Sequence, residues 1–283
     1  MNNFSLIKRI ITKRVKLLAL PSYIFLRKLL KINAARNNLT IFSDDVFIVS
    51  YSRSGNTWFR FLLGHLLFNK KVDFINMDEI VPDIYKKNDN DLRKIKRPRY
   101  LKSHHPFDPR YPKVIYIVRN PKDVLISCYY YYLKFNPNEK KISFNNYFEE
   151  FMNKGVSDFG TWGNNVESWL INRKNIRNGF HLCYYEDLVK NTYNEVKKIL
   201  KFLNLNISSD RILKAIDYGS LTNMRSIETK NFKLSKLLNK TDNKIPFIRA
   251  NKYSTKSKKI TLTNKQINQL KHNFKNTLKL LKY

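Results

Sequence analysis

The chain has 283 residues, 42% of them hydrophobic and 14% aromatic, so it can bury one large core or two modest ones. Its 54 Lys and Arg against 22 Asp and Glu give a formal charge of +32, which suggests nucleic acid, an anionic membrane or an anionic small ligand as a partner. The basic residues are spread along the whole chain, which favours solvated surface lysine, and no specific nucleic acid is expected. The two cysteines, Cys128 and Cys183, lie in apolar stretches, which excludes a disulfide framework and a clustered zinc site. They are typical of a reducing compartment, so a cytoplasmic location is expected.

Residues 1–40 are predicted to form a basic amphipathic N-terminal extension. Residues 4–20 place apolar side chains on one helical stripe and most lysines and arginines elsewhere. The longest uncharged run, residues 17–26, is too short to span a bilayer. Two interpretations stay open: the helix lies peripherally on an anionic membrane surface, or it packs its stripe on the following domain.

From residue 41 to residue 283 the sequence alternates predicted strands and helices. A polar stretch at residues 83–98 is predicted to be a loop around a short helix, and Asn120 followed by Pro121 is a typical helix start. Strands separated by helices predict an α/β fold with three αβα layers, a central parallel sheet and a P-loop-like strand-turn-helix. The predicted strands are residues 46–50, 99–104, 113–118 and 180–185, and the main helices are residues 57–68, a helix from 121, 194–205 and 264–281.

The turn after the first strand has the composition of an anion site. Gly55 lets the backbone turn sharply, and the free N–H groups of the turn and of the following helix start would point at an anion. Arg53 adds a forked, permanent cation suited to phosphate or sulfate oxygens. The turn has one glycine followed by Asn56, so it lacks the glycine pattern of nucleotide triphosphatases.

Two other strand ends also carry anion-binding or titratable residues. Arg119 ends the third strand and Ser127 lies on the next helix, both able to reach a phosphate near the turn. Alternatively, Arg119 is an ion-pair partner and Ser127 an ordinary helix hydroxyl. Lys102, His104 and His105 follow the second strand and add a cation and an imidazole at the same edge.

Together these motifs resemble a known enzyme family. The segments YSRSGNTW, LKSHHPF, IVRNPKDVLISCYYYY, GTWGNNVESWL and YYEDL, in this order, are similar to the sulfotransferases that use 3'-phosphoadenosine 5'-phosphosulfate (PAPS), most closely the cytosolic type. The resemblance runs from about residue 41 to the end and implies a sulfotransferase domain over 41–283.

The resemblance also implies roles for individual residues. His104 stands where the family has its catalytic base, and Lys102 where a lysine assists near the sulfuryl group. His105 is expected to pack or to form hydrogen bonds. Arg119 and Ser127 match the pair that binds the 3'-phosphate. The residues implied to contact the 5'-phosphosulfate or the adenine are Arg53, Ser54, Gly55, Asn56, Thr57, Trp58, Tyr185 and Leu221.

The sequence departs from the family pattern at several places, among them Leu221, which stands where an aromatic is usual. Arg53 replaces the usual loop lysine, so it keeps the positive charge but is expected to act electrostatically and not by donating a proton. Residues 247–261 align with the loop that closes over the 3'-phosphate. That stretch keeps Arg249 but has Ala250 and Asn251 in place of Lys-Gly.

The expected reaction is an in-line transfer of the sulfuryl group from PAPS to an acceptor hydroxyl. A neutral His104 would take the proton of that hydroxyl, Arg53 and Lys102 would stabilise charge on the leaving phosphate, and neither a metal nor a covalent intermediate is expected. A small molecule, a carbohydrate and a lipid remain open as acceptors. Aromatic residues between 129 and 162 could line the acceptor pocket or belong to the core. The alternatives are a P-loop kinase-like phosphotransferase and a non-enzymatic basic protein that binds nucleic acid or membrane.

Overall fold

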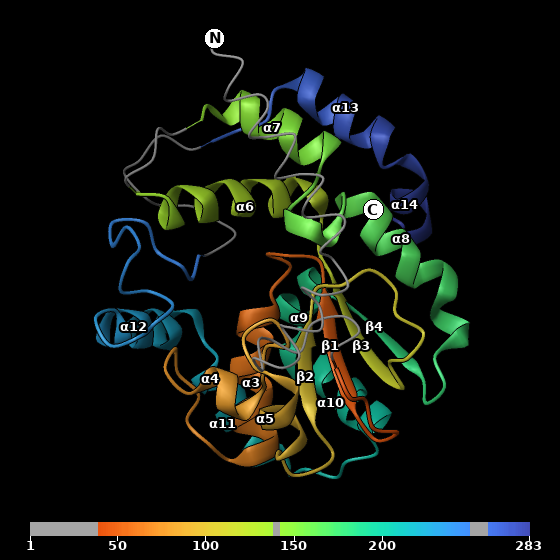
Figure 1. Cartoon of the computed structure of the whole chain (residues 1–283), viewed down its shortest axis with the longest axis vertical. Coiled ribbons are helices and arrows are strands. Elements are labelled where there is room, and N and C mark those ends of the chain that lie inside the picture. The colour runs from red at the N-terminus through yellow and green to blue at the C-terminus, as the bar shows by residue number, and fades with distance from the viewer. Residues whose placement is uncertain (1–38, 138–141, 250–259) are drawn as a thin grey trace, which may run out of the picture. The chain divides into compact units, whose positions relative to one another are not determined.

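The computed structural model describes residues 39–137, 142–249 and 260–283 (Figure 1). The predicted extension at residues 1–40 lies almost wholly outside the described residues, so both interpretations of it remain predictions. The main compact unit comprises Ile41–Pro82 and Arg97–Tyr283. Residues Asp83–Lys96, with Leu39 and Thr40, belong to a separate small unit.

Among its described residues, the small unit contains one short helix, α5 (Asp89–Arg93), which lies within the stretch 83–98 predicted to be a loop around a short helix. The side chain of Asn88 caps this helix by accepting a hydrogen bond from the backbone N–H of Asp91. Both carboxylate oxygens of Asp89 accept hydrogen bonds from Thr40, from its N–H at 2.6 Å and from its hydroxyl at 2.7 Å. These contacts join the two sequence segments of the unit.

The main unit is built around a four-stranded parallel sheet with the strand order β2-β1-β3-β4. Because β1 pairs with β2 on one side and with β3 on the other, the chain leaves β1 in one direction and later returns to its opposite side. Parallel α/β sheets bind ligands at the carboxyl ends of strands at such a switch point. The strands are β1 (Val46–Ser50), β2 (Tyr100–Ser103), β3 (Lys113–Val118) and β4 (Phe180–Tyr184).

Helices lie between β1 and β2 and between β3 and β4, and more follow β4, whereas residues 104–112 join β2 to β3 without a helix (Figure 1). The connections also contain two 3-10 turns, Ser157–Phe159 and Arg173–Asn175. The α-helices of the main unit are α3 (Asn56–Phe68), α4 (Met77–Ile80), α6 (Pro121–Phe135), α7 (Phe144–Asn153), α8 (Trp162–Asn172), α9 (Tyr185–Lys190), α10 (Thr192–Leu203), α11 (Ser209–Tyr218), α12 (Leu221–Asn231), α13 (Asn264–Asn273) and α14 (Lys275–Leu281).

Both faces of the sheet are covered, as the continuous apolar strands require. On one face, Ile48 and Ile115 are fully buried in a cluster with apolar side chains of α3, α10 and α11. On the other face, Phe47 stacks on Tyr111 with ring centroids 3.5 Å apart, and Tyr116 packs on Trp169 of α8. The predicted αβα architecture with a central parallel sheet is therefore confirmed.

Helix α6 begins where the sequence predicts it. Pro121 is its first residue, and the Asn120 side chain accepts a hydrogen bond from the N–H of Lys122 at 3.1 Å. This cap fixes the start of the helix that carries Ser127.

The prediction of one continuous helix over residues 264–281 is wrong, because the chain leaves helical geometry at Phe274 (φ −106°, ψ 19°) and forms α13 and α14. The buried Phe274 ring packs on Trp162 at 5.2 Å and lies over Gly163, where a Cβ would come within 2.7 Å of it. Burial of this aromatic ring against α8 accounts for the break. Within the described part of the chain, none of the helices combines the length and the apolar character needed to cross a bilayer.

Candidate active site

The turn between β1 and α3 has a backbone shape that depends on glycine. Gly55 has φ +100°, and a Cβ at this position would lie 2.3 Å from the ring of Tyr185. Arg53 also has a positive φ, 64°, which is uncommon for a residue with a side chain. The turn is thus held in one conformation with Tyr185 directly against it.

Polar groups within the turn connect the strand to the helix. The Asn56 amide donates to the carbonyl of Ile48 at 3.3 Å and to the Ser50 hydroxyl at 3.2 Å, so this side chain has a structural use. Gly55 precedes α3 without a side-chain cap, which leaves the first-turn N–H groups of Asn56, Thr57 and Trp58 for another acceptor. The Ser54 hydroxyl is fully buried and finds no hydrogen-bond partner among the described residues. A turn of this kind suits an anion.

Arg53 reaches across the turn to two other elements. Its Nε donates to the Ser127 hydroxyl on α6 at 3.2 Å, and its Nη2 donates to the carbonyl of Phe247 at 3.2 Å. The guanidinium lies 4.9 Å from the ring centroid of Tyr131 and 4.7 Å from that of Phe247. Tyr131 was considered only for an acceptor pocket, and Phe247 only as the start of the stretch aligned with the 3'-phosphate loop. Their contact with Arg53 was not predicted, because nothing in the sequence marks which aromatics surround an arginine.

Arg119 lies at the carboxyl end of β3, next to the same turn. Its Nη1 donates to the carbonyl of Arg53 at 3.2 Å, and its guanidinium lies 4.5 Å from the ring centroid of Tyr185. Burial raises the pKa of the Tyr185 phenol, and the charge of Arg119 opposes that shift. The structure therefore brings Arg53, Arg119, Ser127 and Tyr185 together around Gly55.

The predicted adenine-side residues are joined to this group through Trp58. Its ring meets Tyr185 edge to face at 6.2 Å, and its indole N–H donates to the carbonyl of Gly219 at 2.9 Å. Gly219 comes two residues before Leu221, the first residue of α12, whose side chain is exposed. Arg249 lies over the ring of Tyr130 on α6, 3.3 Å from its centroid.

His104 follows β2 and contacts the end of β1. Its Nδ1 lies 2.6 Å from the carbonyl oxygen of Ser50. Because a carbonyl can only accept, Nδ1 carries the proton in this contact, and Nε2 of a neutral ring is left as the acceptor. The sequence could not reveal the Ser50 carbonyl as the partner of His104, since it belongs to the backbone of a neighbouring strand.

His105 has a different environment from His104. It is buried, its backbone N–H donates to the Ser103 hydroxyl, and its backbone carbonyl accepts from the Trp169 indole at 2.9 Å. His104 is half-buried beside the edge of the Phe159 ring, 5.4 Å away. Lys102 occupies β2 opposite Ile48, two residues before His104.

Several aromatics considered for an acceptor pocket lie in the core. Tyr129, Phe148, Phe151 and Trp162 are all buried, as the alternative interpretation held. Tyr51 is also fully buried. Its hydroxyl accepts from the Val156 N–H at 2.9 Å and donates to the Gly160 carbonyl at 3.0 Å, which ties the turn at 155–161 to the end of β1.

Two further observations concern possible metal ligands and the location of a pocket. Across the described ranges, no three His, Cys, Asp or Glu side chains are grouped so as to hold a metal ion. A pocket of about 310 Å³ lies at the opposite, amino edge of the sheet, and none of the predicted site residues lines it. It is lined by Ser43, Asp44, Val46, Pro98, Tyr100, Lys113, Asn178, Leu203 and Leu205.

Comparison with known proteins identifies the class. The family model of the sulfotransferase domain matches residues 43–282. Mouse sulfotransferases 2A6 and 2A1 are 30% and 32% identical over 211 and 215 residues, and each alignment covers 71% of this chain and 73% of the relative. Rat sulfotransferase 1E1 is 31% identical over 209 residues, covering 68% of this chain and 69% of the relative.

Solved structures agree on the fold. A retinol dehydratase in complex with androsterone and the inactive cofactor PAP has a TM-score of 0.68 at 18% identity, covering 86% of this chain and 82% of its own. Mouse sulfotransferase SULT7A1 complexed with PAP has a TM-score of 0.65 at 22% identity, covering 85% of each chain.

The chain belongs to the sulfotransferase family. The enzyme class predicted from the sequence, a PAPS-dependent sulfotransferase, is confirmed by the family model and the relatives.

Proposed function

We propose that this enzyme transfers the sulfuryl group of PAPS to the hydroxyl of a small-molecule acceptor, with His104 as the general base. The observation that carries the proposal is the convergence of Arg53, Arg119 and Ser127 on the β1–α3 turn, next to a histidine with a fixed tautomer. PAPS supplies the sulfuryl group and a leaving phosphate.

The proposed binding roles follow from the chemistry of the side chains. Arg119 and Ser127 hold the 3'-phosphate, and the N–H groups of residues 55–58 hold the 5'-phosphosulfate. Trp58, Tyr185 and Leu221 contact the adenine, and Arg249 adds charge near the 3'-phosphate. The buried hydroxyl of Ser54 and the uncapped start of α3 support an anion at the turn.

The proposed catalytic roles divide between a base and two cations. The Nε2 atom of His104 accepts the proton of the acceptor hydroxyl, because Nδ1 is held as a donor by the Ser50 carbonyl. Arg53 and Lys102 stabilise the negative charge that builds on the leaving oxygen. Arg53 has no proton to give near neutral pH, so its contribution is electrostatic.

A small alcohol or phenol is the proposed acceptor class. A guinea pig relative, 30% identical over 210 residues, is named 3-beta-hydroxysteroid sulfotransferase, which supports a hydroxyl on a small apolar molecule. Carbohydrate and lipid acceptors, contact of residues 1–40 with a membrane surface and a cytoplasmic location stay predictions. A screen of alcohols, phenols, sugars and lipids with sulfur-labelled PAPS identifies the acceptor.

A thermal-shift experiment tests the co-substrate. Adenosine 3',5'-bisphosphate is expected to raise Tm without a metal ion, because binding to the folded state alone stabilises it. ATP with magnesium is expected to raise Tm less. Stabilisation by ATP with magnesium alone would favour the kinase-like alternative instead.

The assignment of the base is tested by two histidine variants. His104→Ala is expected to lower kcat by roughly 10²- to 10⁴-fold, the usual contribution of general base catalysis, with no change in the Kd for adenosine 3',5'-bisphosphate. His105→Ala is expected to lower Tm and to keep most of the turnover, because His105 is buried away from solvent. Retained turnover in His104→Ala with loss in His105→Ala would contradict the assignment.

A further inference from the structure

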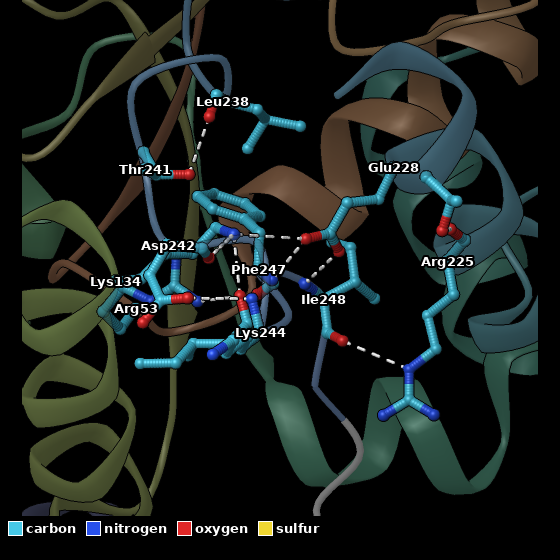
Figure 2. A network of polar contacts seen from close by, with 12 residues as sticks. Arg53, Lys134, Arg225, Glu228, Leu238, Thr241, Asp242, Lys244, Phe247 and Ile248 are labelled. Carbon is cyan, nitrogen blue, oxygen red and sulfur yellow. Dashed lines mark hydrogen bonds and ion pairs between the residues drawn. The ribbon is translucent and has the colours of Figure 1, made fainter. Parts of the chain in front are cut away.

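A buried pair of opposite charges lies outside the predicted site residues. Lys134, near the end of α6, is 1% exposed, and Glu228 on α12 is 7% exposed. The Lys134 Nζ lies 3.6 Å from Glu228 Oε1 (Figure 2). Buried charges persist in proteins when they are paired and hydrogen-bonded, so the contacts of this pair indicate its use.

Both side chains bind the backbone of one segment, residues 242–248. Lys134 Nζ donates to the carbonyls of Asp242 at 2.9 Å and Ile245 at 2.7 Å. The two Glu228 oxygens accept from successive backbone N–H groups, Oε1 from Phe247 at 2.6 Å and Oε2 from Ile248 at 2.9 Å. Figure 2 shows the carboxylate facing this backbone from α12 and Lys134 approaching from α6.

The segment held in this way contacts Arg53. The Phe247 carbonyl accepts from Arg53 Nη2 at 3.2 Å, and the Phe247 ring lies 4.7 Å from the guanidinium carbon. Glu228 and Arg53 therefore bind the same peptide group, Phe247–Ile248: Glu228 accepts from its N–H and Arg53 donates to its carbonyl. A shift of Phe247 therefore moves both the hydrogen-bond acceptor and the aromatic face that orient Arg53.

We propose that Glu228, supported by Lys134, is a positioning residue that sets the orientation of Arg53 through the backbone of Phe247. The inference rests on the proposed role of Arg53 at the sulfuryl group. Glu228 touches neither reactant in this proposal and acts only through the position of Arg53. Burial lowers the pKa of the Lys134 ammonium, and Glu228 opposes that shift, so each charge supports the other.

The test compares Glu228→Gln with a matched variant far from the site. Glutamine can accept one of the two N–H groups but presents an amide donor to the other. Loss of one charge-assisted hydrogen bond is expected to lower kcat/KM for PAPS about tenfold. Asp45→Asn is the control, since Asp45 is fully buried and bonded to Arg99 at Nε (2.8 Å) and Nη2 (2.5 Å), outside the proposed machinery. It is expected to lower Tm while leaving kcat/KM unchanged well below Tm.

A double-mutant cycle with Arg53→Ala separates positioning from general stabilisation. If Glu228 acts through Arg53, Glu228→Gln has less than about a twofold effect on kcat/KM once Arg53 is absent, because coupled residues are not additive. A full tenfold further loss in the Arg53→Ala background would overturn the proposal, and so would an unchanged kcat/KM in Glu228→Gln alone.

A second variant, Glu228→Asp, tests the same role of Glu228 with a smaller change. If Glu228→Gln fails to fold, Glu228→Asp keeps both acceptor oxygens on a shorter side chain, and it is expected to lower kcat/KM less than tenfold with the same dependence on Arg53. Absence of that dependence overturns the proposal. Failure of the proposed function has a different signature, because the unaltered enzyme would then show no thermal shift with adenosine 3',5'-bisphosphate.

Discussion

Two histidines of this chain, His104 and His181, lie in different environments. The Nδ1 of His104 donates a hydrogen bond to the Ser50 carbonyl. His181 on β4 instead stacks on Phe202 with ring centroids 5.3 Å apart, and its Nε2 is buried. Burial lowers the pKa of His181 below its usual 6.5, with Glu195 opposing the shift and Lys198 adding to it. The neutral form of His181 is therefore part of the folded state.

His181 makes stability depend on pH in a defined direction. As pH falls below 6.5, the unfolded chain binds a proton at this residue before the folded chain does, so the free energy of unfolding decreases. His181→Leu removes this proton uptake, so Tm is expected to fall less between pH 7.5 and 5.5 than in the unaltered protein. His272→Leu, which removes an exposed imidazole, is the control. A variant with the same decrease in Tm as the unaltered protein would contradict this prediction.

At the same scale, the sequence marked some of the residues that the structure brings together around the β1–α3 turn and left others unmarked. Arg53, Arg119 and Ser127 could be predicted because each follows a strand or a helix start, where parallel sheets gather ligand groups. Glu228 and Lys134 could not, because they are 94 positions apart and burial of a charged side chain leaves no local pattern. The tautomer of His104 depends on the Ser50 carbonyl and was equally hidden.

At the scale of elements, the cap at the start of α6 stabilises a helix that carries one candidate site residue and directly follows another. The helix begins with the Asn120 cap directly after Arg119 and carries Ser127 two turns later. Helix α7 has a comparable cap, in which the Ser143 hydroxyl accepts from the Asn146 N–H at 3.2 Å, but it carries none of the predicted site residues. The two caps form a matched pair for mutation.

Removal of these caps is expected to separate stability from binding. Asn120→Ala and Ser143→Ala should each cost about 1 kcal/mol, the usual contribution of an N-cap. In a domain of this size that lowers Tm by roughly 2–4 °C. Only Asn120→Ala is expected to raise the Kd for adenosine 3',5'-bisphosphate, measured by calorimetry, because it loosens the turn between Arg119 and Ser127. Equal changes in Kd for both variants would contradict this.

The elements themselves were predictable where local chemistry was strong. The strands Val46–Ser50 and Lys113–Val118 contain the uninterrupted apolar runs 46–49 and 114–118, and their predicted limits agree with the structure. The break at Phe274 was missed, since helical periodicity continues across it and only the tertiary contact with Trp162 interrupts it.

For the whole molecule, the dominant property is the formal charge of +32. Like charges repel one another within the folded state, and salt screens exposed charges over about 10 Å at 0.1 M. Tm is therefore expected to rise when sodium chloride increases from about 0.02 M to about 0.3 M. Chloride is the appropriate anion, because sulfate and phosphate resemble the proposed ligands. A Tm that falls over this range would show that favourable ion pairs outweigh the repulsion.

The two buried cysteines can be used to measure how often the regions around them open. Burial raises the pKa of the Cys128 thiol to about 12 although Arg53 and Arg119 lower it, and burial raises the pKa of Cys183 as well. Thiols in this state react with alkylating reagents only when the chain opens. Cys128 lies on α6, with its Sγ 4.0 Å from the Ser52 carbonyl, and Cys183 lies in β4, so iodoacetamide reports on the opening of two regions separately. If adenosine 3',5'-bisphosphate slows the alkylation of Cys128 more than that of Cys183, its binding reduces opening mainly at the β1–α3 turn. The measurement needs no engineered label.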